Sequence, residues 1–344
     1  MNVNTNGRNS SKRPTLEDVA RVAGVSRAMA SIVVRGAPGA SRESKTKVLA
    51  AIEQVGYRPD TRARSLAAAR NRLIGVQFTL ESYFHTRLVG RLYEHAASLN
   101  YQLLLSGTTE HRSSAEALNT LVSARPEGII MIDPGDLDPA LLLGTPGVAI
   151  GHTGPETVDH VVTSGRDGIV MALEHLSALG HRDICHVTIS DHAAARQRLD
   201  AYTNWMSHHS LETDVLQLKQ SGIRDGAKAG RALLERDRLP TAVVAYNDEI
   251  ASGCLLELNR GGGSVPEQLS IIGYDNVGWA ATGVRLTTVS QRMGELAKQS
   301  LDALVERVEG ETDHAGPRRI ELDPILHIRE TTGPVPELGF VSTS

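Results

Sequence analysis

The sequence predicts an α/β protein with a small all-helical N-terminal head and a two-lobed core built on parallel sheets. Its 344 residues exceed the usual length of one domain. From residue 73 onward, short apolar runs alternate with amphipathic segments of helical period, which is typical of parallel sheets covered by helices. Residues 1–72 carry 14 Lys and Arg against 5 Asp and Glu, whereas the rest carries 22 against 35. We therefore expect nucleic acid to bind at the basic end only.

The composition argues against several classes of protein. Hydrophobic residues make up 40% of the chain and aromatics only 3%, so the core must be mostly aliphatic. No apolar run is long enough to cross a bilayer, and residues 1–13 lack the apolar region of a secretory signal. We predict a cytoplasmic protein with no membrane partner. Cys185 and Cys254 are expected to be reduced core residues, without the spacing of a metal site.

Residues 14–59 are predicted to form three helices. The first begins after Thr15, which has the capping-box spacing to Asp18, and ends at Gly24. Ser26 is the expected N-cap of a second helix that runs to about residue 35, and a third runs from residue 41 to 56. Two short helices around a glycine-containing turn are typical of a helix-turn-helix. The predicted apolar faces are Leu16, Val19, Ala20 and Ala23 in the first helix, and Val48, Leu49, Ile52 and Val55 in the third.

The second helix is the predicted recognition helix, whose N-terminal residues meet base edges in the major groove. Arg27 follows the cap directly and is the expected reader of guanine, while Ala28 and Met29 offer apolar contacts. For any one basic residue, an ordinary solvated surface charge is an equally good interpretation; for the set, DNA contact is favoured. The predicted contacts of this head are Thr15, Ser26, Arg27, Ala28, Met29, Ser31, Arg35, Arg42, Lys45 and Tyr57.

The head resembles the DNA-binding domain of the LacI/GalR family of transcription regulators. The similar segments are Thr-Leu-Glu-Asp at 15–18, Val-Ala-Arg-Val-Ala-Gly-Val-Ser at 19–26, Val-Leu-Ala-Ala-Ile at 48–52, Gly-Tyr-Arg-Pro at 56–59 and Ala-Arg-Ser-Leu at 63–66. The resemblance implies a homodimeric repressor of double-stranded operator DNA, controlled by a sugar-like small-molecule effector. Control by a protein corepressor is the alternative. We predict no catalytic residues, metal or cofactor, because no nucleophile elbow, metal triad or phosphate loop is present.

Residues 60–72 are predicted to be a hinge. They are rich in Ala and Arg and offer almost no apolar face, so a helix there is marginal in water. In the resembling family this segment folds on operator DNA, and the leucine of its Ala-Arg-Ser-Leu motif enters the minor groove. The resemblance implies that role for Leu66 and phosphate or groove contacts for Arg62 and Arg64. A simple flexible linker is the competing interpretation.

Residues 73–333 resemble the periplasmic sugar-binding fold found in the same family. The resemblance implies one lobe of about 73–163 and 291–322 and a second of about 164–290 and 323–333, with tails at 1–13, expected to be disordered, and 334–344. The apolar runs predict strands at 73–78, 102–105, 128–132, 148–150, 184–189, 242–246, 269–272 and 287–289. The helical periods predict helices at 88–99, 169–179, 250–259 and 293–308.

A ligand of such a core binds beyond the carboxyl ends of the strands, between the lobes. The resemblance implies that Arg198 and Asp275 grip the effector, that Tyr83 and Phe84 stack on it, and that Asn247 lies nearby. This set suits a neutral polyhydroxy ligand. Helix capping by Asn247 and packing between the lobes by Tyr83 and Phe84 are alternatives.

One departure from the family pattern concerns the effector. Ser164 stands where the family usually has a strand-end aspartate, so a pocket carboxylate is lost. The neighbouring His152, His160 and Arg166 could favour a more polar or acidic ligand. Because the chain has 13 histidines, scattered surface histidine is the competing interpretation.

Overall fold

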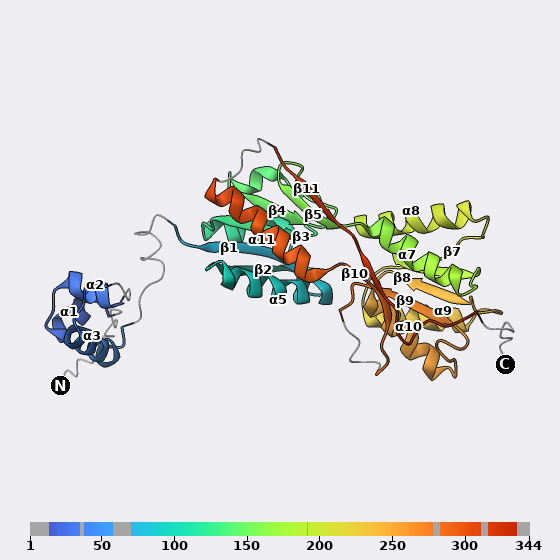
Figure 1. The fold of residues 1–344 in the computed structure, drawn as a ribbon, viewed down its shortest axis with the longest axis horizontal. Coiled ribbons are helices and arrows are strands. Elements are labelled where there is room, and N and C mark those ends of the chain that lie inside the picture. Colours follow the sequence, from blue (N-terminus) through green and yellow to red (C-terminus); the bar gives the residue numbers. More distant parts are fainter. Residues whose placement is uncertain are drawn as a thin grey trace, which may run out of the picture. The chain divides into compact units, whose positions relative to one another are not determined.

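The computed structural model describes residues 14–34, 38–57, 70–190, 192–277, 283–310 and 316–335. The chain divides into two compact units, residues 1–71 and residues 72–344 (Figure 1). The predicted N-terminal tail and most of the predicted hinge lie outside the described residues, as do Arg35, Arg62, Arg64 and Leu66. Among the described residues, no helix is both long and apolar enough to cross a membrane.

The head contains α1 (Leu16–Ala23), α2 (Arg27–Val34) and α3 (Arg42–Val55). The predicted capping box is present: Thr15 Oγ1 accepts the Asp18 N–H, and Asp18 Oδ2 accepts the Thr15 N–H at 2.9 Å. Ser26 Oγ accepts the Met29 N–H at 3.2 Å at the start of α2. Gly24 and Gly56 end α1 and α3 with φ of 63° and 64°, a left-handed conformation that glycine adopts at little cost.

The core of the head is formed by small aliphatic side chains. α1 contributes Val19, Ala20 and Ala23, α2 contributes Ala30, and α3 contributes Val48 and Ala51. The prediction that Leu49 belongs to the apolar face of α3 is wrong, because Leu49 is 56% exposed. Successive residues in an α-helix lie about 100° apart, so a helix that turns Val48 inward presents Leu49 to solvent.

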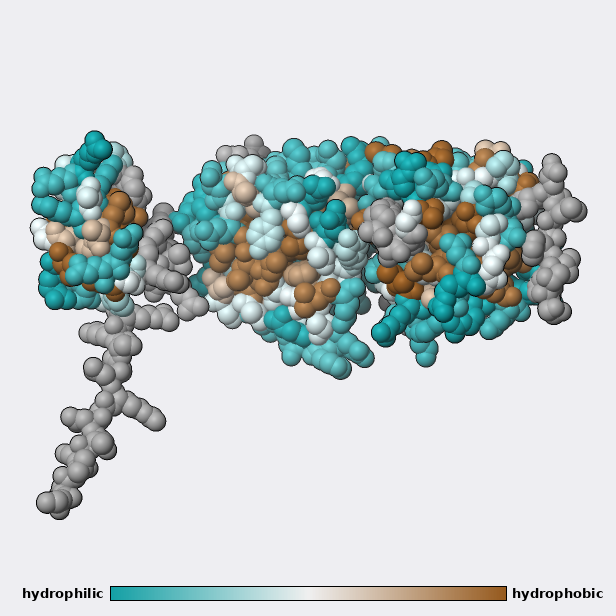
Figure 2. Space-filling model, turned by 90° about the horizontal axis from the view of Figure 1, so that it is seen from below, coloured by the Kyte–Doolittle hydropathy of each residue, from teal (hydrophilic) through white to brown (hydrophobic). Residues whose placement is uncertain are grey.

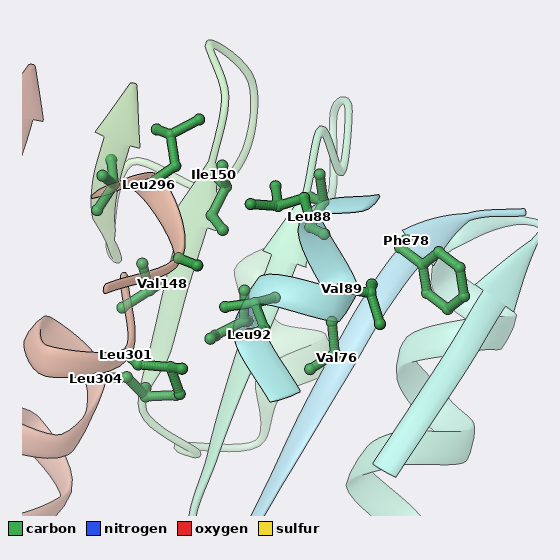
Figure 3. Packing of buried hydrophobic residues seen from close by; sticks show 14 of the residues in the cluster. Val76, Phe78, Leu88, Val89, Leu92, Val148, Ile150, Leu296, Leu301 and Leu304 are labelled. Atoms are coloured by element: carbon green, nitrogen blue, oxygen red, sulfur yellow. The ribbon is translucent and has the colours of Figure 1, made fainter. Parts of the chain in front are cut away.

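The first lobe is a parallel six-stranded sheet with the order β11-β5-β4-β3-β1-β2. Two hydrophobic clusters involve this sheet. Helices α5 and α11 pack with it in one cluster (Figure 3), and α6 and η1 pack with it in the second. The elements are β1 (Leu73–Thr79), α5 (Tyr83–Ser98), β2 (Gln102–Thr108), α6 (Ser114–Ser123), β3 (Gly128–Ile132), η1 (Pro139–Leu142), β4 (Gly147–Ile150), β5 (Asp159–Thr163), α11 (Met293–Glu309) and β11 (Arg319–Leu322).

The second lobe is a six-stranded sheet with the order β12-β10-β9-β8-β6-β7, parallel except for the β10–β12 pair. Helices α7 and α8 share one of its clusters, and α9 and α10 share the other. The elements are α7 (Gly165–Ala178), β6 (Ile184–Ile189), α8 (Ala193–His208), β7 (Asp214–Leu218), α9 (Ile223–Leu234), β8 (Ala242–Ala245), α10 (Asp248–Arg260), β9 (Ser270–Tyr274), β10 (Thr287–Ser290) and β12 (Ile325–His327).

The chain passes between the lobes after β5, after β10 and again after β11 (Figure 1). As a result, α11 and β11 complete the first lobe although most of the second lobe precedes them in the sequence. The predicted strand list omits β5, β7, β11 and β12. Three of these, β7, β11 and β12, are edge strands with partly exposed side chains, so their apolar pattern is weak. Cys185 and Cys254 are buried and unpaired.

Candidate functional site

A cavity of about 200 Å³ lies between the two lobes of the core. Most of its polar walls come from residues at or just after the carboxyl ends of parallel strands, because these ends face one another across the lobes. The first lobe contributes Thr79, Ser82, Phe84, His85, Asp133, Gly151, His152 and Thr163. The second lobe contributes Ile189, His192, Arg198, Ser221, Tyr246, Asn247 and Asp275, and Gln291 follows β10.

Arg198, on α8, is held between two tyrosine rings. Its guanidinium carbon lies 3.5 Å from the centre of the Tyr274 ring and 4.8 Å from that of Tyr246. Its Nη1 donates to the Tyr246 carbonyl oxygen at 2.5 Å, and its Nη2 lies 4.0 Å from Asp275 Oδ1. Arg198 is only 4% exposed. Cation–π contacts of this kind strengthen when the cation is desolvated, so the orientation of Arg198 is fixed before a ligand arrives.

Asp275 follows β9 in a conformation that an aspartate rarely adopts, with φ of 104°. Gln291 Nε2 donates to its Oδ1 at 2.6 Å. Burial raises the pKa of Asp275 to about 6, and the positive charge of Arg198 works against that rise. A strained backbone that carries a buried carboxylate is a common feature of binding sites.

Asn247 both caps a helix and lines the cavity. Its Oδ1 accepts the Ile250 N–H at 2.9 Å at the start of α10, and its Nδ2 donates to the Ser221 carbonyl at 3.0 Å. The structure therefore brings Phe84, Arg198, Asn247 and Asp275 together around the cavity. It does not bring Tyr83 there: Tyr83 is 44% exposed and is not among the residues that line the cavity.

Sequence reasoning missed a second carboxylate in the cavity, that of Asp133. It directly follows β3, with φ of 43°. Asp133 Oδ2 lies 3.2 Å from His85 Nε2, and the Nδ1 of His85 accepts the Thr79 N–H at 3.1 Å. Burial is the largest single influence on the pKa of Asp133 and raises it, but the hydrogen bond with His85 and the proximity of His85, His192 and His152 together hold this pKa below its usual value. The sequence signal that could have indicated Asp133 is its position directly after the apolar run 128–132, which is fully buried in the structure.

Two more histidines lie close to Asp133. His152 Nε2 bonds to the Thr163 carbonyl oxygen at 3.1 Å, and His192 Nδ1 lies 3.2 Å from the Tyr246 hydroxyl. Burial lowers the pKa of both imidazoles. His160 and Arg166 do not line the cavity. Of the three residues expected to favour a more polar or acidic ligand, only His152 lines the cavity. Ser164 is the N-cap of α7 and accepts the Asp167 N–H.

Comparisons with known proteins decide the family. Residues 15–60 match the bacterial regulatory proteins of the lacI family, and residues 173–332 match a periplasmic binding protein-like domain. The crystal structure of a LacI transcriptional regulator from a Rhodococcus species is 31% identical, with a TM-score of 0.70, over 77% of this chain and 100% of that one. This chain belongs to the LacI family.

Two further relatives cover nearly the whole chain of this LacI-family protein. A Lac repressor dimer bound to operator and the anti-inducer ONPF is 26% identical, with a TM-score of 0.78, over 94% of this chain and 100% of that one. The HTH-type transcriptional repressor PurR of Actinobacillus pleuropneumoniae serotype 3 (strain JL03) is 29% identical over 92% of this chain and 98% of its own. The chain is a DNA-binding transcriptional repressor with a helix-turn-helix head and a periplasmic-binding-protein-like core.

The head of this LacI-family repressor presents its polar residues at the starts of its helices. Thr15 is exposed at the start of α1, Ser26, Arg27 and Ala28 at the start of α2, and Arg42 and Lys45 at the start of α3. Met29 and Ser31 are partly buried, and Tyr57 packs against the core of the head. The predicted contacts at Arg35, Arg62, Arg64 and Leu66 lie outside the described residues.

Proposed function

We propose that this repressor binds a near-palindromic operator as a homodimer and that a small polar molecule in the interlobe cavity controls its affinity for DNA. The observation that carries the proposal is the convergence of polar groups from both lobes on one cavity. A molecule bound there contacts both lobes at once, so its binding energy depends on the angle between them. Any ligand that prefers one lobe angle shifts the equilibrium between DNA-binding states.

Support for operator binding comes from the start of α2. Arg27 is exposed there, directly after the Ser26 cap, so its side chain is free to reach a base edge. The first amides of a helix also favour a nearby phosphate. Arg42 and Lys45 are exposed at the start of α3 and suit phosphate contacts, as the family resemblance implies.

Support for a homodimer comes from exposed apolar side chains on the first lobe. Figure 2 shows hydrophobic residues gathered on one face of this lobe. Large apolar side chains that remain exposed in the β1–α5–β2 region are Leu80, Tyr83, Tyr93 and Leu105. A second copy of the chain would cover such a surface. Sedimentation equilibrium should therefore give twice the chain mass, and a stable monomer at micromolar concentration would contradict this part of the proposal.

Selection of DNA from a random pool, followed by fluorescence anisotropy, tests operator binding. The protein should enrich a near-palindromic sequence, and its affinity should fall steeply with salt. Arg27→Ala should weaken binding to the selected operator by about 10-fold or more, because one bidentate base contact contributes roughly 1–3 kcal/mol. Lys298→Ala, a change on α11 of the core, is the control and should bind as the unaltered protein does. Equal affinity for selected and random DNA would refute sequence-specific binding.

A thermal-shift screen with sugars, polyols and nucleosides tests control by a small molecule. A ligand of the cavity should raise Tm and should change operator affinity in the anisotropy assay. Arg198→Ala should abolish both effects. If no compound changes operator affinity and a protein from the same cell does, control by a protein corepressor replaces this part of the proposal.

A further inference from the structure

We propose that the effector is an amine-bearing polyol, such as an amino sugar, whose protonated amine is seated against Asp133. This inference rests on the proposed function, since it names the ligand class of the same cavity. Three observations support it: the charged residues that line the cavity, the hydrogen bonds that the lining residues already form, and the volume of the cavity.

The first observation is that the negative charges of the cavity are not matched. Among the described residues that line it, the carboxylates are Asp133 and Asp275, and the only Arg or Lys is Arg198. Arg198 donates to the Tyr246 carbonyl, stacks on Tyr274 and points Nη2 toward Asp275. Within the described part of the chain, no Arg or Lys forms an ion pair with Asp133.

The hydrogen bonds of two neighbouring imidazoles fix them as neutral rings. His85 accepts the Thr79 N–H at Nδ1, so this nitrogen carries no proton and the ring is neutral while it donates Nε2–H to Asp133. His152 accepts from Arg319 Nη2 at Nδ1 while its Nε2 donates to the Thr163 carbonyl, which also fixes a neutral ring. Burial lowers the pKa of His192, which favours its neutral form.

The carboxylate of Asp133 lies against the backbone of Gly151. A Cβ atom at position 151 would lie 2.0 Å from Asp133 Oδ1, so the carboxylate occupies the space that a side chain would take. Oδ2 is bonded to His85, whereas Oδ1 has no hydrogen-bond donor among the described residues. One oxygen of the Asp133 carboxyl group is therefore left for a ligand, and a cation there would form a charge-assisted hydrogen bond.

The rest of the cavity limits the ligand's size and chemistry. The cavity has a volume of about 200 Å³, which admits a small molecule. The amide of Asn247 is occupied by Ile250 and Ser221, and that of Gln291 donates to Asp275. Arg198 Nε has no hydrogen-bond partner among the described residues, so one buried donor remains for a hydroxyl oxygen of the ligand. A polyol with one ammonium group suits both this donor and the carboxylate of Asp133.

The decisive experiment compares matched ligands on the dimeric protein by isothermal titration calorimetry and thermal shift. Glucosamine, galactosamine and mannosamine are the amine probes; the parent hexoses and the uronic acids are their neutral and anionic counterparts. At least one amino sugar should bind about 10-fold or more tightly than its parent hexose, and the uronic acids should bind least. Equal or tighter binding of the hexoses or uronic acids, or binding by none of the amino sugars, would overturn the inference.

A matched pair of variants tests whether Asp133 is the residue that contacts the ligand's protonated amine. Asp133→Asn should remove the advantage of the amino sugar over the hexose, whereas Asp136→Asn should keep it, because Asp136 is exposed and does not line the cavity. Retention of the advantage in Asp133→Asn would place the amine elsewhere. The ligand series on the unaltered protein decides the question even if Asp133→Asn does not fold. If neutral or anionic compounds bind and change operator affinity, the proposed function stands and only the ligand class fails.

Discussion

Val277, which follows β9 of the second lobe, is buried in the same hydrophobic cluster as Phe84 of the first lobe. The Val277 N–H donates to Asp248 Oδ2 at 2.9 Å, so α10 fixes its position from the second lobe. Phe84 also lines the cavity. An apolar contact between the lobes thus lies beside the cavity.

Val277→Ala tests this contact between the lobes. Removing two buried methyl groups should lower the free energy of unfolding of the core by about 1–3 kcal/mol, since the space they leave is only partly refilled. Thermal unfolding should show a Tm lower by roughly 2–4 °C for each kcal/mol lost. Val215→Ala is the matched control, because Val215 is 39% exposed on β7 and should change Tm very little. Equal Tm values for the two variants would show that Val277 does not join the lobes.

Asp248 makes the stability of the core depend on pH. Burial, followed by the negative charge of Asp275, raises the pKa of Asp248 to about 8 from an ordinary value of 3.8. Between these two values the folded protein holds a proton that the unfolded chain has released. Stability therefore falls as the pH rises through this window and levels off above about 8.

Asp248→Asn should remove this dependence. In the structure, the Val277 N–H and the Thr288 hydroxyl both donate to Asp248. In the variant, the amide oxygen can accept the Val277 N–H, and the amide nitrogen can donate to Thr288 Oγ1 in the reverse direction. The variant should match the unaltered protein near pH 5 and exceed it by several degrees of Tm at pH 9. Asp200→Asn, at an exposed position, should follow the unaltered protein at every pH. A constant difference between Asp248→Asn and the unaltered protein across the range would contradict the assignment.

The fold could be predicted wherever burial leaves a simple local pattern. The fully buried strands β3 and β8 are unbroken apolar runs in the sequence, and the caps at Thr15 and Gly24 set the bounds of α1. Edge strands such as β7 alternate between exposed and half-buried side chains, so a short polar run could equally be a loop. The exchange of strands between lobes has no local signature, since it depends on contacts far apart in the sequence; only the family resemblance implied it.

Contacts between residues far apart in the sequence also limited the prediction of single residues of the candidate site. Arg198 and Asp275 were predicted through the resemblance, whereas the motifs that carry the resemblance do not include Asp133. No local pattern links Asp133 with His85, because the parallel strands β1 and β3 bring them together. Tyr83 was misplaced for another reason: adjacent helical residues point about 100° apart, so Phe84 faces the cavity and Tyr83 does not.

The angle of about 100° between successive helical residues predicts opposite results for two neighbouring residues of α3. Val48→Ala should destabilise the head by about 1–3 kcal/mol because Val48 is fully buried against α1 and α2. Leu49→Ala should have almost no effect, since Leu49 projects into solvent. Circular dichroism of the full chain during thermal unfolding, together with operator binding at raised temperature, measures the difference. A larger loss for Leu49→Ala would mean that Leu49 is covered in solution.

Arg198→Lys separates the charge of Arg198 from its planar shape. Lysine keeps the positive charge but cannot stack as a plane between Tyr246 and Tyr274, because its ammonium is a compact charge on a flexible stem. We expect a lower Tm, a loss of about 10-fold or more in effector affinity, and unchanged operator affinity in the absence of effector, since the head is not altered. Arg196→Lys, on the same helix but exposed, is the control and should bind effector normally. If Arg198→Lys keeps the full effector affinity, the positive charge of Arg198 alone is sufficient and the stacked geometry has no role in binding.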